Sequence, residues 1–220
     1  MNAFDILGPV MIGPSSSHTA GAARIGRITR KLLGSRPVKA DIFLHGSFAK
    51  TYKGHGTDKA LIAGIMDMKT DDPRIRRAPE LAKEEGLEVT ITTGDIDGAH
   101  PNTARVALTD QLGRQVTLLG SSIGGGNILV TEVNGMDVSI TGQHTTLIVL
   151  HRDAPGTIAA VTEVLADAGV NICNFRLSRE EKGGQAVMTI ELEGNFNSNL
   201  NDVINSLPNI FSSTMLQPIS

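Results

Sequence analysis

Cysteine is nearly absent from this sequence, which has one, Cys173, among 220 residues. A single cysteine cannot form a disulfide within the chain, and it cannot supply the three or four thiolates that a structural zinc ion or an iron–sulfur cluster takes from one protein. Cys173 follows Ile172 in a segment with strand character, where a small buried residue is its ordinary role. We therefore expect no metal held by the cysteines of this chain.

Aromatic residues and excess positive charge are also scarce. The chain has six Phe, one Tyr and no Trp, which argues against a stacking platform for bases or sugars. Its 20 Lys and Arg face 23 Asp and Glu, for a formal net charge of -3, so no positive field is available for a phosphate backbone. No apolar run approaches the ~18 residues of a membrane span, and the Met-Asn-Ala-Phe start lacks the features of an export signal. These absences predict a soluble cytoplasmic protein that binds neither nucleic acid nor membrane.

Apolar residues make up 40% of the chain, enough to fill the core of one large domain or two modest ones. From Thr145 onward, turn residues separate segments with strand and helix periodicity. The predicted order is strand 146–151, helix 156–168, strand 170–178, strand 186–192, helix 199–206 and strand 210–216. This βαββαβ order is that of the ferredoxin-like unit, and we assign it to residues 145–220.

Residues 1–143 have a different sequence pattern, in which glycine-rich connections separate helices from strands. The patterns predict helices at 22–33 and 58–68, and strands at 39–45, 87–93, 104–109, 116–119 and 128–133, with one more strand and a linker in 133–143. The fold class is α+β, with a mixed α/β N-terminal domain. The spacing of Arg24, Arg27 and Arg30 places them on a solvated or interface face, with no catalytic role.

Candidate functional side chains are densest in segment 8–21, Gly-Pro-Val-Met-Ile-Gly-Pro-Ser-Ser-Ser-His-Thr-Ala-Gly. Its hydroxyls directly precede the helix expected to start near Ala20, where free backbone N–H groups favour an anion. The structural alternative is that Ser17 or Thr19 only caps this helix. His18 favours a functional site, because an imidazole that titrates near neutral pH among small hydroxyls suits general acid–base work on a carboxylate-bearing substrate.

Three further segments combine glycine with hydroxyl, amide or histidine side chains. Segment 45–58 leads to Thr57 or Asp58, which could simply cap the next helix; the other two are 100–103 (His-Pro-Asn-Thr) and 120–127 (Gly-Ser-Ser-Ile-Gly-Gly-Gly-Asn). The three consecutive glycines allow a ligand or a neighbouring chain to approach the backbone closely. They match neither the Gly-x-Gly-x-x-Gly nor the P-loop pattern, so no nucleotide is inferred.

Together, residues 13–21, 45–47, 54–58, 100–103 and 120–127 resemble the beta chain of the bacterial iron–sulfur-dependent L-serine dehydratases. Residues from Thr145 on resemble an ACT domain, the small amino-acid-sensing module found in beta chains of the two-subunit form. The N-terminal part, by the same resemblance, is similar to the allosteric substrate-binding domain of certain 3-phosphoglycerate dehydrogenases. The resemblance covers nearly the whole chain.

The resemblance implies that an alpha chain carries the cysteines for a [4Fe-4S] cluster with one iron open to serine, and that the beta chain contributes the serine–histidine motif. It makes His18 an acid–base or substrate-orienting group. The residues that it assigns to substrate binding are Ser15, Ser16, Ser17, Thr19, His45, Asp58, His100, Asn102, Gly125 and Asn127. The expected outcome is conversion of L-serine to pyruvate and ammonia with the alpha subunit.

Two other functions compete with this one. A substrate-binding-like domain joined to an ACT domain could be a regulatory chain that senses an amino acid and does no chemistry. A serine hydrolase using one of Ser15 to Ser17 is disfavoured, because we expect no Gly-x-Ser-x-Gly elbow in this chain and His18 is adjacent in sequence instead of being brought in from elsewhere.

The turn after the first strand of the ACT-like module is the predicted effector site. Asp153 and Gly156 flank the N-terminus of the next helix, whose N–H groups could hold a carboxylate. Asn171 begins the following strand and is expected to lie nearby. The alternative is that Asp153 caps the helix and that the module serves assembly alone. In ACT domains like this one, such sites form between two modules, so the chain is expected to pair with a copy of itself and to bind a small amino acid, serine first.

Overall fold

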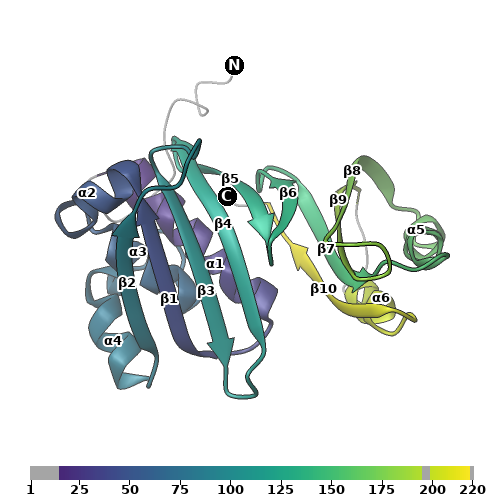
Figure 1. The fold of residues 1–220 in the computed structure, drawn as a ribbon, viewed down its shortest axis with the longest axis horizontal. Coiled ribbons are helices and arrows are strands. Elements are labelled where there is room, and N and C mark those ends of the chain that lie inside the picture. Colours follow the sequence, from purple (N-terminus) through teal and green to yellow (C-terminus); the bar gives the residue numbers. More distant parts are fainter. Residues whose placement is uncertain (1–14, 195–198, 219–220) are drawn as a thin grey trace. The chain divides into compact units, whose positions relative to one another are not determined.

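The computed structural model describes residues 15–194 and 199–218 and divides the chain into two compact units, 1–134 and 135–219. The part of the serine–histidine segment before Ser15, and the Met-Asn-Ala-Phe start, lie outside the described residues. The two units are described separately below (Figure 1).

The first unit combines helices with a mixed sheet. Its elements are a π-helix (Ser16–Gly21), α1 (Ala22–Leu33), β1 (Pro37–His45), α2 (Gly46–His55), α3 (Thr57–Ile65), a 3-10 helix (Pro73–Arg77), α4 (Ala78–Glu84), β2 (Glu88–Gly94), β3 (Thr103–Asp110), β4 (Gln115–Gly124) and β5 (Asn127–Val133). The strands run in the order β2-β1-β3-β4-β5. β1 and β2 are parallel and the remaining pairs antiparallel, because α2, α3 and α4 provide the long crossover that a parallel pair needs.

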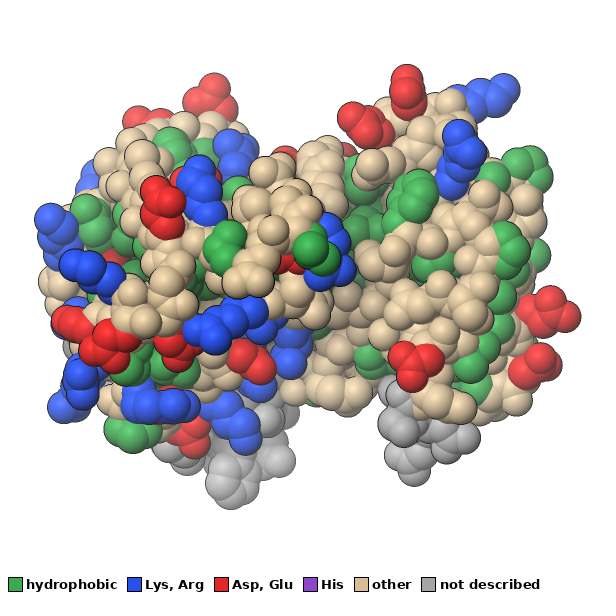
Figure 2. All heavy atoms as spheres, turned by 90° about the horizontal axis from the view of Figure 1, so that it is seen from below, with side chains coloured by type: hydrophobic (Ala, Val, Ile, Leu, Met, Phe, Trp, Pro, Cys, Tyr) green, Lys and Arg blue, Asp and Glu red, His purple; other side chains and the backbone are tan. Residues whose placement is uncertain are grey.

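Helices α1 and α3 cover one face of this sheet (Figure 1). The predicted apolar stripe of α1, Ile25, Ile28 and Leu32, is buried, which confirms the helical period inferred from the sequence. Burial alternates along β1 and β3, as expected for a sheet covered on one side. In the view of Figure 2, basic and acidic side chains are interspersed over the first unit rather than separated by sign.

Two glycines set the close approach of α1 and α3. A Cβ on Gly26 would lie 2.3 Å from the carbonyl oxygen of Leu61, and one on Gly64 would lie 2.0 Å from that of Ala23. These distances are below any normal contact, so the two helix backbones touch where side chains would otherwise separate them.

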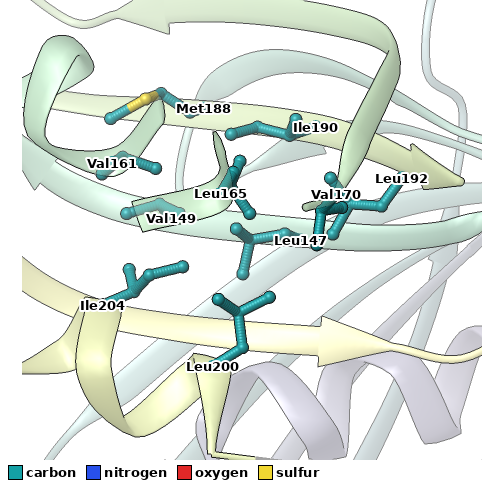
Figure 3. Packing of buried hydrophobic residues seen from close by; sticks show 10 residues of the cluster. All are labelled: Leu147, Val149, Val161, Leu165, Val170, Met188, Ile190, Leu192, Leu200 and Ile204. Carbon is teal, nitrogen blue, oxygen red and sulfur yellow. The ribbon is translucent and has the colours of Figure 1, made fainter. Parts of the chain in front are cut away.

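The second unit contains β6 (Met136–Ile140), β7 (Thr145–Arg152), α5 (Thr157–Asp167), β8 (Asn171–Arg179), β9 (Gln185–Glu193), α6 (Leu200–Asn205) and β10 (Ile210–Leu216). The strand order β10-β7-β9-β8, with β7–β9, β8–β9 and β7–β10 antiparallel, is that of the predicted βαββαβ unit. Its core lies between the sheet and the two helices (Figure 3) and comprises Leu147, Val149, Val161, Leu165, Val170, Met188, Ile190, Leu192, Leu200 and Ile204. Strand β9 is buried on both faces, including Val187 and Thr189, although its sequence alternates.

The first unit departs from the sequence prediction in four places. Segment 46–55, expected to be a turn, is helix α2; the helical turns begin at Ser16 rather than near Ala20; and most of 120–127, expected to be a loop, extends β4 to Gly124. Helix α4 was not predicted at all. The start of α2 depends on a tertiary contact, since the N–H groups of Ser47 and Phe48 both donate to the carbonyl of Pro101. No local pattern could reveal such a partner.

Candidate functional site

The serine–histidine motif forms a wide helical turn that leads directly into α1. The turn is a π-helix. This geometry is rare in proteins as a whole, but many of its occurrences are at functional sites. Its N-cap is Ser15, whose hydroxyl accepts a hydrogen bond from the backbone N–H of His18 at 3.3 Å, and whose carbonyl accepts from Thr19 N–H at 2.9 Å. The predicted cap at Ser17 or Thr19 is therefore wrong, because the helical turns begin earlier than the apolar periodicity suggests.

His18 is held between two serine hydroxyls. Its Nδ1 lies 3.2 Å from Ser15 Oγ, and its Nε2 lies 3.2 Å from Ser47 Oγ at the start of α2. In either neutral tautomer one ring nitrogen donates to a serine and the other accepts. Since a hydroxyl can reverse its role, this pair lets the ring give up or take a proton without losing both contacts.

Two rings pack edge-on against the His18 imidazole. The buried Phe48 ring is 5.3 Å away and the His55 ring 4.8 Å away, both measured between ring centroids. Burial lowers the pKa of His18 below its ordinary 6.5, and the positive charge of His55 lowers it further. His18 is therefore neutral near pH 7, the form that a general base requires.

The loop before β3 is bonded to the start of α2, at Ser47. Pro101 accepts from Ser47 N–H at 2.7 Å, and its backbone would lie 2.6 Å from a Cβ at Gly46, whose φ is +59°. The neighbouring Asn102 carbonyl accepts from Ser122 N–H at 2.9 Å. These bonds bring the predicted Asn102 to the same place as the His18–Ser47 pair, and they add Ser122 of β4.

Ser122 is the centre of Gly120-Ser-Ser-Ile-Gly124, which matches the letters Gly-x-Ser-x-Gly and was missed in the sequence prediction. The structure places it within strand β4, which is followed by a hairpin to β5 and not by a helix. Its hydroxyl is buried and lies 2.0 Å from the position of a Cβ at Gly21. A nucleophile elbow needs an exposed serine on a strand-to-helix turn, so this match does not indicate a hydrolase.

The remaining predicted substrate-binding residues form hydrogen bonds to other residues. Nδ1 of His45 accepts from Ile96 N–H at 3.1 Å and lies 3.6 Å from Oδ1 of the exposed Asp95. His100 Nδ1 accepts from Asn102 N–H at 3.1 Å, and Asp58 accepts from Lys59 N–H at 2.8 Å. In the serine–histidine motif, the side chains of Ser16, Ser17 and Thr19 form no hydrogen bond to any described residue.

Gly125 and Asn127 lie at the β4–β5 turn, where Gly124, Gly125 and Gly126 all have positive φ. This turn is tied to α1 by a residue that the sequence prediction misplaced. Arg24, expected on a solvated or interface face, is only 7% exposed, and its Nη1 donates to the carbonyl of Gly126 at 2.6 Å. Burial lowers its pKa. Arg27, by contrast, is paired with the exposed Asp67 as a surface residue would be.

In the second unit, Asp153 stabilises a hairpin rather than a helix. Its Oδ2 accepts from Gly183 N–H at 3.1 Å and from Arg179 Nη1 at 2.9 Å. These bonds, that of Gly183 first, lower the pKa of its carboxyl. Gly156 is the N-cap of α5, with φ +87° and no atom within 4 Å of an added Cβ.

Asn171 lies at the opposite end of the sheet from Asp153, which corrects the expectation that the two are close. Asn171 pairs with Glu193, whereas Arg152, the neighbour of Asp153, pairs with Gln185 at the other end of β9. The reason is topological: β7 and β8 are parallel, so α5 returns the chain to the starting end before β8 begins. The Asn171 amide donates to Glu193 at 3.2 Å.

A cavity of about 360 Å³ opens at the Asp153 end of this unit. Its lining includes the turn glycines Gly183 and Gly184, the strand residue Gln185, and Asn209 and Phe211 near the start of β10. Arg152 is the one charged residue in the lining. The cavity thus offers a cation and backbone groups to a small anionic ligand.

The described residues contain no group of three or more His, Cys, Asp or Glu placed to hold a metal ion. Cys173 is exposed, and its thiol is 3.3 Å from the Glu191 carbonyl; the buried role expected for it is wrong. With one cysteine in the whole sequence, the donor set does not fit an iron–sulfur cluster. In residues 15–194 and 199–218, none of the helices has the length and apolar character of a membrane span.

The fold and the site define a two-unit α+β chain that ends in an ACT-type βαββαβ module. Family models agree: residues 2–97 match "Serine dehydratase beta chain" and residues 141–211 match "ACT domain".

Whole-chain relatives give the same result. The chain is 46% identical to the probable L-serine dehydratase beta chain of Bacillus subtilis, over 97% of this chain and 96% of that one. It is 35% identical to the L-serine dehydratase beta chain of Peptoniphilus asaccharolyticus, over 92% of each. It is 25% identical to a D-3-phosphoglycerate dehydrogenase of Methanocaldococcus jannaschii, over 90% of this chain but 37% of that enzyme. The chain belongs to the L-serine dehydratase beta-chain family.

Proposed function

We propose that this chain is the beta subunit of an L-serine ammonia-lyase. In that reaction L-serine loses water to give aminoacrylate, which tautomerises to the imine and is hydrolysed to pyruvate and ammonia. The single observation that carries the proposal is the environment of His18: in a chain of this family, the motif histidine is neutral and clamped between Ser15 and Ser47. A neutral imidazole in a fixed orientation is what proton transfer to or from a substrate requires.

The proposed role of His18 is to move the proton of the reacting serine. Ser15 and Ser47 keep the ring oriented, because each hydroxyl can accept a hydrogen bond from a ring N–H or donate one to an unprotonated ring nitrogen. Asn102 lies beside them as a donor and acceptor for substrate polar groups. Ser16 and Ser17, whose hydroxyls have no partner in the described chain, are available for the same purpose.

The residues of this chain do not fit the [4Fe-4S] cluster, and we propose that an L-serine dehydratase alpha chain supplies it through its own cysteines. The experiment is co-expression with such an alpha chain, followed by anaerobic visible spectroscopy and a pyruvate assay. We expect this chain alone to be colourless and inactive, and the pair to be coloured and active. Rapid serine deamination by this chain alone, without iron, would contradict the proposal, and an alpha chain fully active by itself would make this chain regulatory.

We also propose that the ACT unit binds a small amino acid at the Asp153 end of its sheet. The N-terminus of α5 after Gly156 and the cavity containing Arg152 lie at this end, and both favour a carboxylate. Asn171 lies at the other end of the sheet, so the Asn171 of the same chain cannot contact this ligand. The Asn171 of a second copy can do so if the β8 strands of the two copies run antiparallel. Titration calorimetry on the full chain with serine and a panel of amino acids tests this; no heat from any of them would leave the unit an assembly element.

A further inference from the structure

Arg24 is a buried cation without a counter-ion in the described part of the chain. It is 7% exposed, its sole described hydrogen bond goes to the neutral carbonyl of Gly126, and its buried Nε has no partner. Buried charges are costly unless they are paired. A neutral carbonyl compensates little of that cost, so the position calls for an anion.

Two more buried donors without partners lie in the same unit, one on the first helical turns and one on β4. Thr19 Oγ1 and Ser122 Oγ are both buried, with no hydrogen bond to described residues. Ser122 lies directly under Gly21, two residues after Thr19 and three before Arg24. Arg24 itself reaches Gly126, at the tip of the hairpin that carries Ser122. All three donors therefore lie between the first helical turns and the β4–β5 hairpin.

An unpartnered acceptor completes the group. Asn102 is opposite Ser122, since the two backbones are hydrogen-bonded there, and side chains at opposed positions project from the same face of a sheet. The Asn102 Oδ1 is buried and accepts no hydrogen bond from a described residue. Three donors, one of them charged, together with one acceptor match the carboxylate and ammonium groups of a free α-amino acid.

We propose that Arg24 binds the carboxylate of an α-amino acid, with Thr19 and Ser122 as further donors and Asn102 accepting from the ammonium group. The proposal rests on the proposed function in naming an amino acid as the ligand. Before the ligand binds, Arg24 Nη1 donates its hydrogen bond to the Gly126 carbonyl. The hairpin turn can withdraw it, because Gly124, Gly125 and Gly126 carry no side chains and Gly124 has no atom within 4 Å of an added Cβ.

The test uses the full chain without any partner, with acetate as the probe and acetamide as its uncharged match. The 15N-labelled side-chain Nε–H signals of arginine are followed by NMR during each titration, and Arg24→Gln assigns the Arg24 signal. We expect acetate, and not acetamide, to shift that signal. Arg24→Lys should weaken acetate binding by about tenfold or more, the cost of losing a charge-assisted hydrogen bond. The control Arg27→Gln, on the same helix, should bind acetate as the unchanged chain does.

Two outcomes would overturn the proposal. The first is an Arg24 signal that acetate leaves unmoved. The second is an equal response to acetamide. Because no step of this test needs the alpha chain or pyruvate formation, its failure leaves the proposed function to be judged by the co-expression assay, and a failed co-expression assay leaves this one intact.

Discussion

His18 is the residue on which the proposed chemistry depends, and replacing it tests that directly. His18→Asn keeps a polar side chain that can still contact Ser15 or Ser47 but cannot exchange a proton near neutral pH. In the enzyme assembled with an alpha chain, we expect turnover to fall by at least ~10²-fold, the usual scale for a positioned acid–base group. The matched control is His144→Asn, an exposed histidine. Turnover within a few-fold of normal in the His18 variant would reduce the motif to a helix cap.

The pH dependence of kcat/KM should show the effect of His55 on the pKa of His18. The pKa of His18 lies below 6.5 because of burial first and the charge of His55 second, so activity that needs neutral His18 should persist below pH 6.5. His55→Gln removes the second cause. The acidic limb of kcat/KM should then move to higher pH, yet stay below 6.5 because burial remains. A limb that does not move, or that moves to lower pH, contradicts this assignment.

Asp110 should govern acid stability of the β3–β4 hairpin. It accepts from Ser35 Oγ at 2.6 Å, from Arg114 Nε at 2.7 Å and from two backbone N–H groups, and these bonds lower its pKa from 3.8 to about 2. A lowered carboxyl pKa adds stability above pH 3.8 that is lost as the pH falls through about 2.

Asp110→Asn should therefore lower the melting temperature at pH 7, and the variant should lose less on acidification than the unchanged chain. The control is Asp71→Asn, at an exposed turn position. Equal acid sensitivity of the Asp110 variant and the unchanged chain would refute the assignment.

At the scale of elements, the close contact between α1 and α3 predicts that a side chain at Gly64 destabilises the fold. Gly64→Ala places a Cβ 2.0 Å from the Ala23 carbonyl, so the helices must separate. We expect a loss of about 1–3 kcal/mol in the free energy of unfolding, as for other overpacked cores. Gly54→Ala in α2 meets no atom within 4 Å and should instead stabilise by about 0.5–1 kcal/mol. Urea unfolding of both variants measures the difference, and equal midpoints would refute the close contact.

At the scale of the whole molecule, β8 should govern self-association. It is an edge strand of its sheet, and Phe175 and Leu177 on it are 38% and 39% exposed. Exposed edges with apolar side chains are surfaces on which another chain can pair.

Replacing Phe175 and Leu177 together by Ser should shift the sedimentation coefficient of the chain towards that of the monomer. Leu112→Ser, which changes an 81% exposed side chain in the first unit, is the control. An unchanged coefficient in the double variant would exclude β8 as the self-association surface.

The sequence by itself determined the architecture of the second unit, the course of α1 and the family. The physical reason is that periods of 2 and 3.6 residues, and the turn glycines between them, are local properties that any chain segment carries with it. Gly169, for example, follows the end of α5 with φ +67°, the left-handed conformation that glycine adopts readily after a helix.

The tertiary structure alone decided how the candidate site is built. Ser47 is 29 residues from His18, and Gly126 is 102 residues from Arg24. No periodicity connects positions so far apart. Ser47, His55 and Ser122 were therefore given no individual role, although the motifs 45–47, 54–58 and 120–127 contain them, and Arg24 was assigned to a solvated or interface face. Helical spacing fixes the side of α1 on which Arg24 lies, but whether that side meets water or a glycine turn depends on where β4 and β5 pack.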